Sequence, residues 1–360
     1  MGRAGRMAGV GVALAAGTTL GFLAERRLVR PRLTGPAPLR EPPLGSLAGH
    51  LEVVDGPGGL GVVVETYGPP DAPQLVLSHG WVCTGRVWHE QVAALADRYR
   101  IITYDQPGHG RTGAPPSRTY DLDLIGDTLC AVIEATARPG PLVVAGHSMG
   151  GMAVLNAARR RPDVLAGRLA GAVLLSTTSS AKSEKLTLEV GIQAAARLER
   201  GLRRIVPTLR DPRVLGVTGR ITEATSDLSY LVARATSVGP DPPPGVVEFT
   251  LQLTLDSGPD IVLGLIEAVL GVDEDESLTC LTMPTTIVVG DHDRLTPEGL
   301  SRRMAQRCGA DLVVLTGVGH MAPLEAPEAV NDVLERHLSL AAEQASETPG
   351  PRPRGAGTAA

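Results

Sequence analysis

The stretch VVAGHSMGGMAV, residues 143–154, decides how this chain is interpreted. Two valines lead to a serine, Ser148, that stands between Gly146 and Gly150, and small apolar residues follow it. The apolar run before the serine is typical of a strand, and residues 149–160 have the pattern of a helix. Side chains at the two glycines would clash where the backbone turns sharply from strand to helix. The pattern therefore predicts a strained turn that pushes the serine hydroxyl outward.

A serine hydroxyl becomes nucleophilic only when a base takes its proton and a third group orients that base. The sequence supplies both further along the chain. Asp291 and Asp293 follow the apolar run TTIVVG, and His320 follows the run DLVVLT. Open α/β sheets place their sites at the carboxyl ends of the strands, so these side chains should meet Ser148 there. We expect Asp293 to orient His320, and its rival Asp291, which lies nearer the strand, to cap the following turn.

Strand-like and helix-like segments alternate along most of the chain. We expect strands at 51–56, 60–68, 74–80, 101–105, 142–147, 170–178, 285–291 and 311–317, and helices at 88–98, 122–137, 149–160, 298–307 and 330–340. Such alternation predicts an α/β fold with a mostly parallel eight-stranded sheet covered by helices on both faces. The first two strands are joined by a Gly-Pro-Gly-Gly turn, which makes the start of the sheet antiparallel.

The predicted α/β domain occupies residues 49–342. Within it, residues 179–282 have the sequence pattern of amphipathic helices and contain no clear strand. We therefore expect a helical cap inserted before the seventh strand. Residues 31–48 are rich in proline and are interpreted as a linker. Residues 343–360 have the composition of a disordered tail.

The N-terminal stretch MAGVGVALAAGTTLGFLA, residues 7–24, has no charged residue. It is just long enough to span a bilayer, although glycine, alanine and threonine make its insertion weak. No convincing cleavage site follows it, so we favour an uncleaved membrane anchor within residues 1–30 over a cleaved signal or a soluble extension. With such an anchor the protein is expected to be membrane-associated, and without it we expect a cytoplasmic protein. Arginines flank both ends of the stretch and leave its orientation open.

Composition narrows the choice of partners. The 360 residues have a formal net charge of −5, which argues against nucleic acid as a partner because such proteins need a basic surface. The four cysteines form no pair with metal-ligand spacing and are expected to be free thiols. We therefore expect no metal and no cofactor. The oligomeric state is left open.

Several motifs, taken in order, resemble the α/β-hydrolase family over residues 49–342. They are His79-Gly80-Trp81 after the third strand, YDQPGHGRT at 104–112, the serine turn GHSMGG, Gly290 with Asp293 and Pro297, and Gly319-His320 before Glu325-Ala326-Pro327-Glu328. One departure is Gln106-Pro107, which stands where the family often has Arg-Gly.

The resemblance implies a role for each site residue. Ser148 is the nucleophile, His320 the general base and Asp293 the orienting acid, while the backbone N–H groups of Trp81 and Met149 form the oxyanion hole. His79 is expected to bind loop backbone near the site. His109 is expected to shape its loop.

A serine at this turn, where related epoxide hydrolases and dehalogenases have aspartate, points to acyl chemistry. We expect a small apolar carboxylic ester or related acyl compound as the substrate. C–C bond hydrolysis or cofactor-free perhydrolysis on the same three residues is the alternative. A non-catalytic binding protein on the same fold is a second one, although such proteins usually lack one of the three groups.

Overall fold

The structure is a computed structural model that describes residues 42–165, 168–180, 233–257 and 259–347. The predicted anchor at 7–24, most of the predicted linker, residues 181–232 of the predicted cap and the tail from residue 348 lie outside the described residues. In the described ranges, no helix combines the length and the apolar character that crossing a membrane requires.

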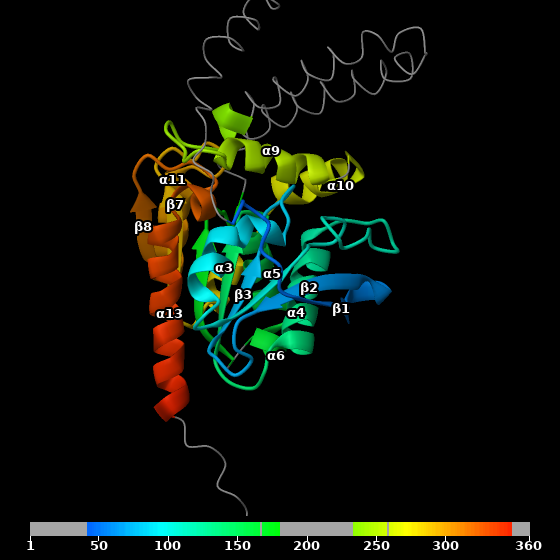
Figure 1. The fold of residues 1–360 in the computed structure, drawn as a ribbon, viewed down its shortest axis with the longest axis vertical. Helices are drawn as coiled ribbons and strands as arrows, with labels where there is room; N and C mark the ends of the chain where they lie inside the picture. The colour runs from blue at the N-terminus through cyan, green and yellow to red at the C-terminus, as the bar shows by residue number, and fades with distance from the viewer. Residues whose placement is uncertain (1–41, 166–167, 181–232, 258, 348–360) are drawn as a thin grey trace, which may run out of the picture.

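Eight strands form a single mixed sheet, as predicted (Figure 1). They are β1 (His50–Asp55), β2 (Gly61–Tyr67), β3 (Gln74–Ser78), β4 (Arg100–Tyr104), β5 (Leu142–His147), β6 (Leu169–Leu175), β7 (Thr285–Gly290) and β8 (Asp311–Leu315). Their order across the sheet is β1-β2-β4-β3-β5-β6-β7-β8. The β1–β2 and β2–β4 pairs are antiparallel, and the other pairs are parallel. The carboxyl ends of β3 to β8 therefore share one edge of the sheet.

Helices cover both faces of this sheet because its central strands are apolar on both sides. In β5, Val143 and Ala145 pack into one buried cluster, and Leu142 and Val144 pack into the other. The first cluster includes residues of α3 (His89–Leu95) and α13 (Pro327–Glu347), and the second includes residues of α4 (Leu122–Thr136), α5 (Met149–Arg160) and α11 (Glu298–Cys308). Three short elements complete these layers: η3 (Gly85–Trp88), α6 (Pro162–Leu165) and α12 (Ala322–Glu325). The short turn η2 (Pro57–Gly59) joins β1 to β2.

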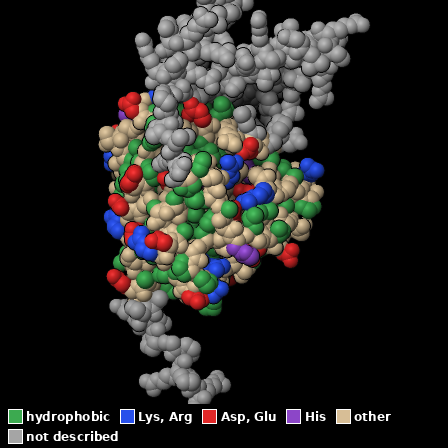
Figure 2. Space-filling model, viewed as in Figure 1, with side chains coloured by type: hydrophobic (Ala, Val, Ile, Leu, Met, Phe, Trp, Pro, Cys, Tyr) green, Lys and Arg blue, Asp and Glu red, His purple; other side chains and the backbone are tan. Residues whose placement is uncertain are grey.

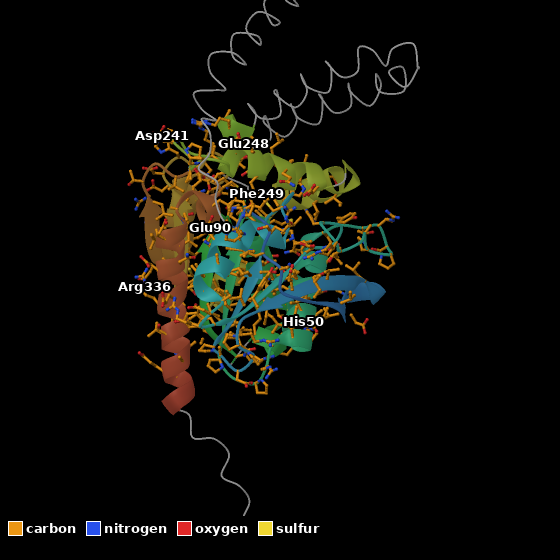
Figure 3. All side chains as sticks on the ribbon, in the orientation of Figure 1. His50, Glu90, Asp241, Glu248, Phe249 and Arg336 are labelled. Atoms are coloured by element: carbon orange, nitrogen blue, oxygen red, sulfur yellow. The ribbon has the colours of Figure 1, made fainter. Side chains whose placement is uncertain are left out.

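The described part of the predicted cap contains α9 (Val246–Asp256), α10 (Pro259–Leu270) and the short turn η4 (Glu276–Cys280). Figure 1 shows α9 and α10 across one end of the sheet, beyond α3 and α5. Phe249 and Leu253 of α9 and Leu265 of α10 are buried in the same two clusters as the sheet. Figure 3 places Phe249 between α9 and the α/β body. These helices are therefore anchored on the body through apolar side chains.

The two ends of the α/β body differ from the prediction. At the start, the last residues of the predicted linker are held on the body, since the Gly45 N–H donates to Nδ1 of His89 (3.1 Å) and Nε of Arg86 donates to the Gly45 carbonyl oxygen (3.0 Å). At the other end, α13 continues to Glu347, so residues 343–347, predicted as tail, are helical. The sequence AAEQASE consists largely of good helix formers, which lets the helix run on.

The surface has charges of both signs. On the face in Figure 2, basic and acidic side chains are interspersed with apolar ones, and neither sign is concentrated there. The predicted site residues Ser148, Asp293 and His320 follow the carboxyl ends of β5, β7 and β8.

Candidate active site

Ser148 stands at the turn between β5 and α5 in a backbone conformation that non-glycine residues rarely adopt, with φ of 53° and ψ of −120°. Two contacts from the end of β6 hold it there. The Ser148 N–H donates to the Leu175 carbonyl oxygen (2.9 Å), and Oγ1 of Thr177 donates to the Ser148 carbonyl oxygen (2.7 Å). The serine is partly exposed, while both of its neighbours are buried. The predicted strained turn is therefore present, with the serine at its apex.

The glycines of this turn are required by close backbone contacts. A Cβ atom on Gly146 would lie 2.4 Å from the Gly150 carbonyl oxygen, and one on Gly150 would lie 2.1 Å from the Ser78 carbonyl oxygen. Real Cβ atoms do not approach backbone so closely. Glycine at both positions lets the first turn of α5 pack directly on the end of β3.

Asp293 and His320 come from the loops after β7 and β8 and meet through a buried hydrogen bond. Nδ1 of His320 lies 3.0 Å from Oδ2 and 3.1 Å from Oδ1 of Asp293. An ionised carboxylate only accepts, so the His320 ring must donate its Nδ1–H, which leaves Nε2 free to take a proton. Thr296 lies beside the pair and donates from Oγ1 to Oδ2 of Asp293 (2.8 Å). The arrangement fixes both the orientation and the tautomer of His320.

Asp293 is kept ionised although its side chain is fully buried. Burial by itself raises the pKa of this carboxyl, but neighbouring His320 and the hydrogen bonds from Thr296 outweigh it, so the pKa lies below its ordinary value. The N–H groups of Leu295 (2.9 Å) and Thr296 (2.8 Å) both donate to Oδ1. The carboxylate is thus available to balance a positive charge on His320.

Asp291, the predicted rival, lies elsewhere. Its Oδ1 accepts hydrogen bonds from the Gly317 N–H (2.8 Å) and from Nδ1 of His292 (2.6 Å), and its side chain is exposed. It therefore joins the loop after β7 to the loop after β8, and it is not the partner of His320.

The loop after β3 lies against the serine turn. A Cβ atom on Gly80 would lie 3.1 Å from Cβ of Ser148 and 3.0 Å from Nδ1 of His147. Two residues later Val82 adopts a φ of 52°, which is rare for a branched side chain. Nε2 of His109 accepts the Val82 N–H (3.2 Å) and so holds this conformation. The loop that includes Trp81 is therefore built as a rigid wall beside Ser148.

His79 and His109 are buried, neutral supports of this wall, in agreement with the roles predicted for them. His79 donates from Nδ1 to the Gly80 carbonyl oxygen and accepts the Gln106 N–H at Nε2, both at 2.8 Å. Burial lowers the pKa of His79 to about 4 and that of His109 to about 3. Gln106, where the chain departs from the family pattern, donates from Nε2 to Oγ of Ser78 (2.8 Å) and to the Tyr104 hydroxyl (3.1 Å).

The predicted oxyanion donors are the backbone N–H groups of Met149, which follows Ser148 in the chain, and of Trp81, in the loop that contacts Ser148. Met149 is the first residue of α5, where a helix leaves its N–H groups without intrahelical acceptors. Trp81 follows Gly80 in the contacting loop. Within the described ranges, neither backbone N–H takes part in a hydrogen bond of the protein. Both groups are thus suited to bind a negative oxygen that forms beside Ser148.

Sequence reasoning missed two supporting side chains, His147 and Thr296. His147 donates from Nε2 to the His320 carbonyl oxygen (2.9 Å), and its ring lies 5.0 Å from the His320 ring. Thr296 binds Asp293 as described above. Both residues lie inside the quoted motifs, but a motif match does not reveal which backbone atom a side chain will reach.

The described residues contain no group of three or more histidine, cysteine, aspartate or glutamate side chains arranged to hold a metal ion. The four cysteines are all free thiols.

Comparison with known sequences identifies a family model that covers most of the described body. The model of the alpha/beta hydrolase family matches residues 75–333. This range begins in β3 and ends in α13, so it contains every candidate site residue discussed above.

Two relatives match this chain over nearly their whole length. A Rhizobium rhizogenes protein provisionally named as the carbamate hydrolase RutD is 28% identical over 284 residues, which is 76% of this chain and 95% of that protein. The pimeloyl-[acyl-carrier protein] methyl ester esterase of Xanthomonas campestris pv. campestris is 28% identical over 269 residues, covering 74% and 95%. Among solved structures, a thermophilic esterase from Thermogutta terrifontis aligns with a TM-score of 0.63 at 23% identity, over 81% of this chain and 100% of that one. This structural likeness supports the fold.

Proposed function

Because the chain belongs to the α/β hydrolase family, we propose that it hydrolyses a carboxylic ester or a related acyl compound with Ser148 as the nucleophile. The observation that carries the proposal is the convergence on one sheet edge of a strained serine turn and a buried Asp293–His320 hydrogen bond. A strained, over-determined backbone at such a turn is typical of functional sites.

In the proposed acylation step, Oγ of Ser148 attacks the substrate carbonyl carbon while Nε2 of His320 takes the hydroxyl proton. The imidazolium that forms is stabilised by the Asp293 carboxylate. The carbonyl oxygen becomes an oxyanion and accepts hydrogen bonds from the N–H groups of Trp81 and Met149, with the positive end of the α5 dipole behind them. His320 then gives its proton to the departing alcohol, which leaves an acyl-enzyme.

In the proposed deacylation step, the same groups act on water. His320 takes a proton from a water molecule, whose oxygen attacks the acyl carbonyl. A second oxyanion forms and accepts hydrogen bonds from the same two N–H groups. Collapse of this intermediate returns the proton to Oγ of Ser148 and releases the acid. No other reactant enters the cycle.

The substrate class is inferred from two sources. The relatives are named for carbamate hydrolysis and methyl ester hydrolysis, both of which involve attack on an acyl carbonyl. The second source is the aliphatic composition of the predicted cap at residues 179–282, which favours an apolar acyl or alcohol group. We therefore propose a small apolar ester as the substrate. Hydrolysis of a C–C bond and perhydrolysis would use the same residues and are distinguished from it by the substrates tested.

A fluorophosphonate probe, which reacts only with activated serines, tests the proposal. The natural chain should be labelled, and Ser148→Ala and His320→Ala should not be. Ser176→Ala is the control, since Ser176 likewise has a positive φ just after the end of a neighbouring strand, but its side chain is buried whereas Ser148 is partly exposed. Hydrolysis of p-nitrophenyl esters of increasing chain length should fall on the order of 10⁴-fold or more in Ser148→Ala.

Two outcomes would overturn the proposal. One is labelling of the folded chain that persists in Ser148→Ala, and the other is full esterase activity in the same variant. If the probe labels Ser148 but the protein hydrolyses only vinylogous diketones or makes only peracids, ester hydrolysis is rejected in favour of C–C bond hydrolysis or perhydrolysis.

We also propose that residues 7–24 attach the enzyme to a membrane. The support is the uncharged run in the sequence and its arginine flanks. Membrane fractionation of the chain with and without residues 1–30 tests this, and recovery of the full chain wholly in the soluble fraction would reject it.

A further inference from the structure

A short segment of the cap lies directly on the loop of His320. We name Arg234–Pro240 the return strap, because it leads from the undescribed part of the cap back to α9. The Ser237 carbonyl oxygen accepts the N–H groups of both His320 (3.0 Å) and Met321 (3.1 Å). The backbone of the proposed base is therefore bound by the cap and not only by its own domain.

A carboxylate completes this contact. Glu325, in α12, accepts the N–H groups of Gly319 at both oxygens (3.1 Å each) and of Met321 at Oε1 (3.0 Å). These two residues flank His320 in the chain. Oε2 of Glu325 also accepts the N–H of Gly239 in the return strap (2.6 Å). One side chain thus ties the loop on both sides of His320 to the cap.

The strap and the loop are in contact backbone against backbone. A Cβ atom on Gly239 would lie 2.1 Å from the Gly317 carbonyl oxygen, and one on Gly319 would lie 2.4 Å from the Val238 carbonyl carbon. Neither position has room for a side chain. A displacement of the strap must therefore move the loop of His320 or break its hydrogen bonds.

The strap also reaches the loop of Asp293. Arg294, the residue after Asp293, donates from Nη1 to the Ala235 carbonyl oxygen. Within the strap, Arg234 donates from Nη1 to the Gly239 carbonyl oxygen (2.6 Å), which stiffens the bend. The return strap is therefore bound to the loop of Asp293 through Arg294 and to the loop of His320 through backbone hydrogen bonds.

We propose that Glu325 is a positioning residue, which couples the seating of the return strap to the placement of His320. Its carboxylate binds the loop on both sides of His320 and the Gly239 N–H together, so a shift of the strap changes the position of the base. Misplacing a catalytic group by about 1 Å can reduce the rate on the order of 10²-fold. The proposal rests on the proposed function, in which His320 is the base.

The experiment compares four folded variants of the full chain with p-nitrophenyl butyrate as substrate. Glu325→Gln keeps the size and one acceptor oxygen, Glu325→Ala removes both acceptors, and Gly239→Ala pushes the strap off the loop while the carboxylate stays. Glu274→Gln is the control, because Glu274 is a buried carboxylate that also joins the cap to the body, through Asn156 and Arg159, away from His320.

We expect kcat to fall about tenfold in Glu325→Gln and about a hundredfold in Glu325→Ala and Gly239→Ala, with KM changed less than about threefold. Glu274→Gln should keep the kcat of the natural chain. Thermal unfolding of every variant separates a folding defect from a positioning defect.

The proposal is overturned if folded Glu325→Gln and Glu325→Ala both retain the natural kcat, or if Glu274→Gln loses as much as they do. Should the Glu325 variants not fold, Gly239→Ala decides: a loss of kcat supports the proposal, and a natural kcat overturns it. Failure of the proposed function is seen separately, as absence of fluorophosphonate labelling in the natural chain.

Discussion

His147 donates a hydrogen bond from Nε2 to the carbonyl oxygen of His320 at 2.9 Å. The residue directly before Ser148, the proposed nucleophile, thereby holds the backbone of the proposed base. Burial, with a smaller contribution from nearby His320, lowers the pKa of His147 to about 3, so its ring is neutral and carries a single N–H. That N–H is on Nε2, because a carbonyl oxygen can only accept.

Replacing His147 should therefore change kcat through the position of His320. In His147→Gln the side-chain amide can still present an N–H at the reach of Nε2, and kcat should remain within about threefold of the natural value. His147→Ala leaves the His320 carbonyl without its donor and should lose about tenfold in kcat, the equivalent of one hydrogen bond. Steady-state kinetics on a p-nitrophenyl ester measures both. Equal kcat in His147→Ala and the natural chain would contradict the expectation.

Substitution of the two aspartates after β7 should separate their roles. Asp293→Asn removes the charge that orients His320 and favours the wrong tautomer, so kcat should fall on the order of 10⁴-fold. Asp291→Asn changes an exposed carboxylate that binds Gly317 and His292, and kcat should stay within about threefold. Kinetics of the two purified variants under one set of conditions checks this. The assignment fails if Asp291→Asn is the more damaged of the two.

Stability should decline as the pH falls from about 6.5 to about 4. His79, His109 and His147 have folded-state pKa values of about 4, 3 and 3, against an ordinary value of 6.5. Below pH 6.5 these three histidines therefore bind protons in the unfolded chain but stay neutral in the folded chain. The free energy of unfolding decreases as a result. Each group contributes about 1.4 kcal/mol per pH unit in that window, so the three together give a slope of up to about 4 kcal/mol per pH unit.

Urea unfolding at pH 7, 6 and 5 measures this slope, and His109→Gln provides its control. The glutamine amide oxygen can still accept the Val82 N–H, so the variant should stay close to the natural chain in stability at pH 7. Its slope should be smaller by about a third, because one of the three titrating groups is gone. A free energy of unfolding that stays level between pH 7 and pH 5 would rule out neutral, buried histidines at these positions.

The sequence made the sheet and its edge predictable because both leave patterns in side-chain type. Apolar runs such as TTIVVG and DLVVLT mark buried strands, and Asp293 and His320 follow them directly. The predicted eight-stranded, mostly parallel sheet and its antiparallel start are confirmed. Motif spacing also separated Asp293 from Asp291 as the partner of His320, in agreement with the geometry.

The return strap could not be predicted in the same way. Its contacts with the His320 loop are made by backbone atoms of Ser237, Val238 and Gly239, and a backbone hydrogen bond places no demand on side-chain type. Glu325 stands inside a quoted motif, yet its three N–H partners come from positions 239, 319 and 321, and only the folded chain brings them together. The contact of Gly45 with the body was not predicted for a similar reason, because a proline-rich composition does not indicate which residues will pack on a domain.

The positive φ angles of Val82, Ser148 and Ser176 also affect any attempt to stabilise this enzyme. All three follow the carboxyl ends of strands, β3, β5 and β6, and each such conformation costs roughly 1–3 kcal/mol for a residue other than glycine. Glycine would relieve that strain at every one of them. A laboratory selection for heat resistance alone would therefore favour glycine at position 148 as well, and some of its most stable variants would lack the proposed nucleophile.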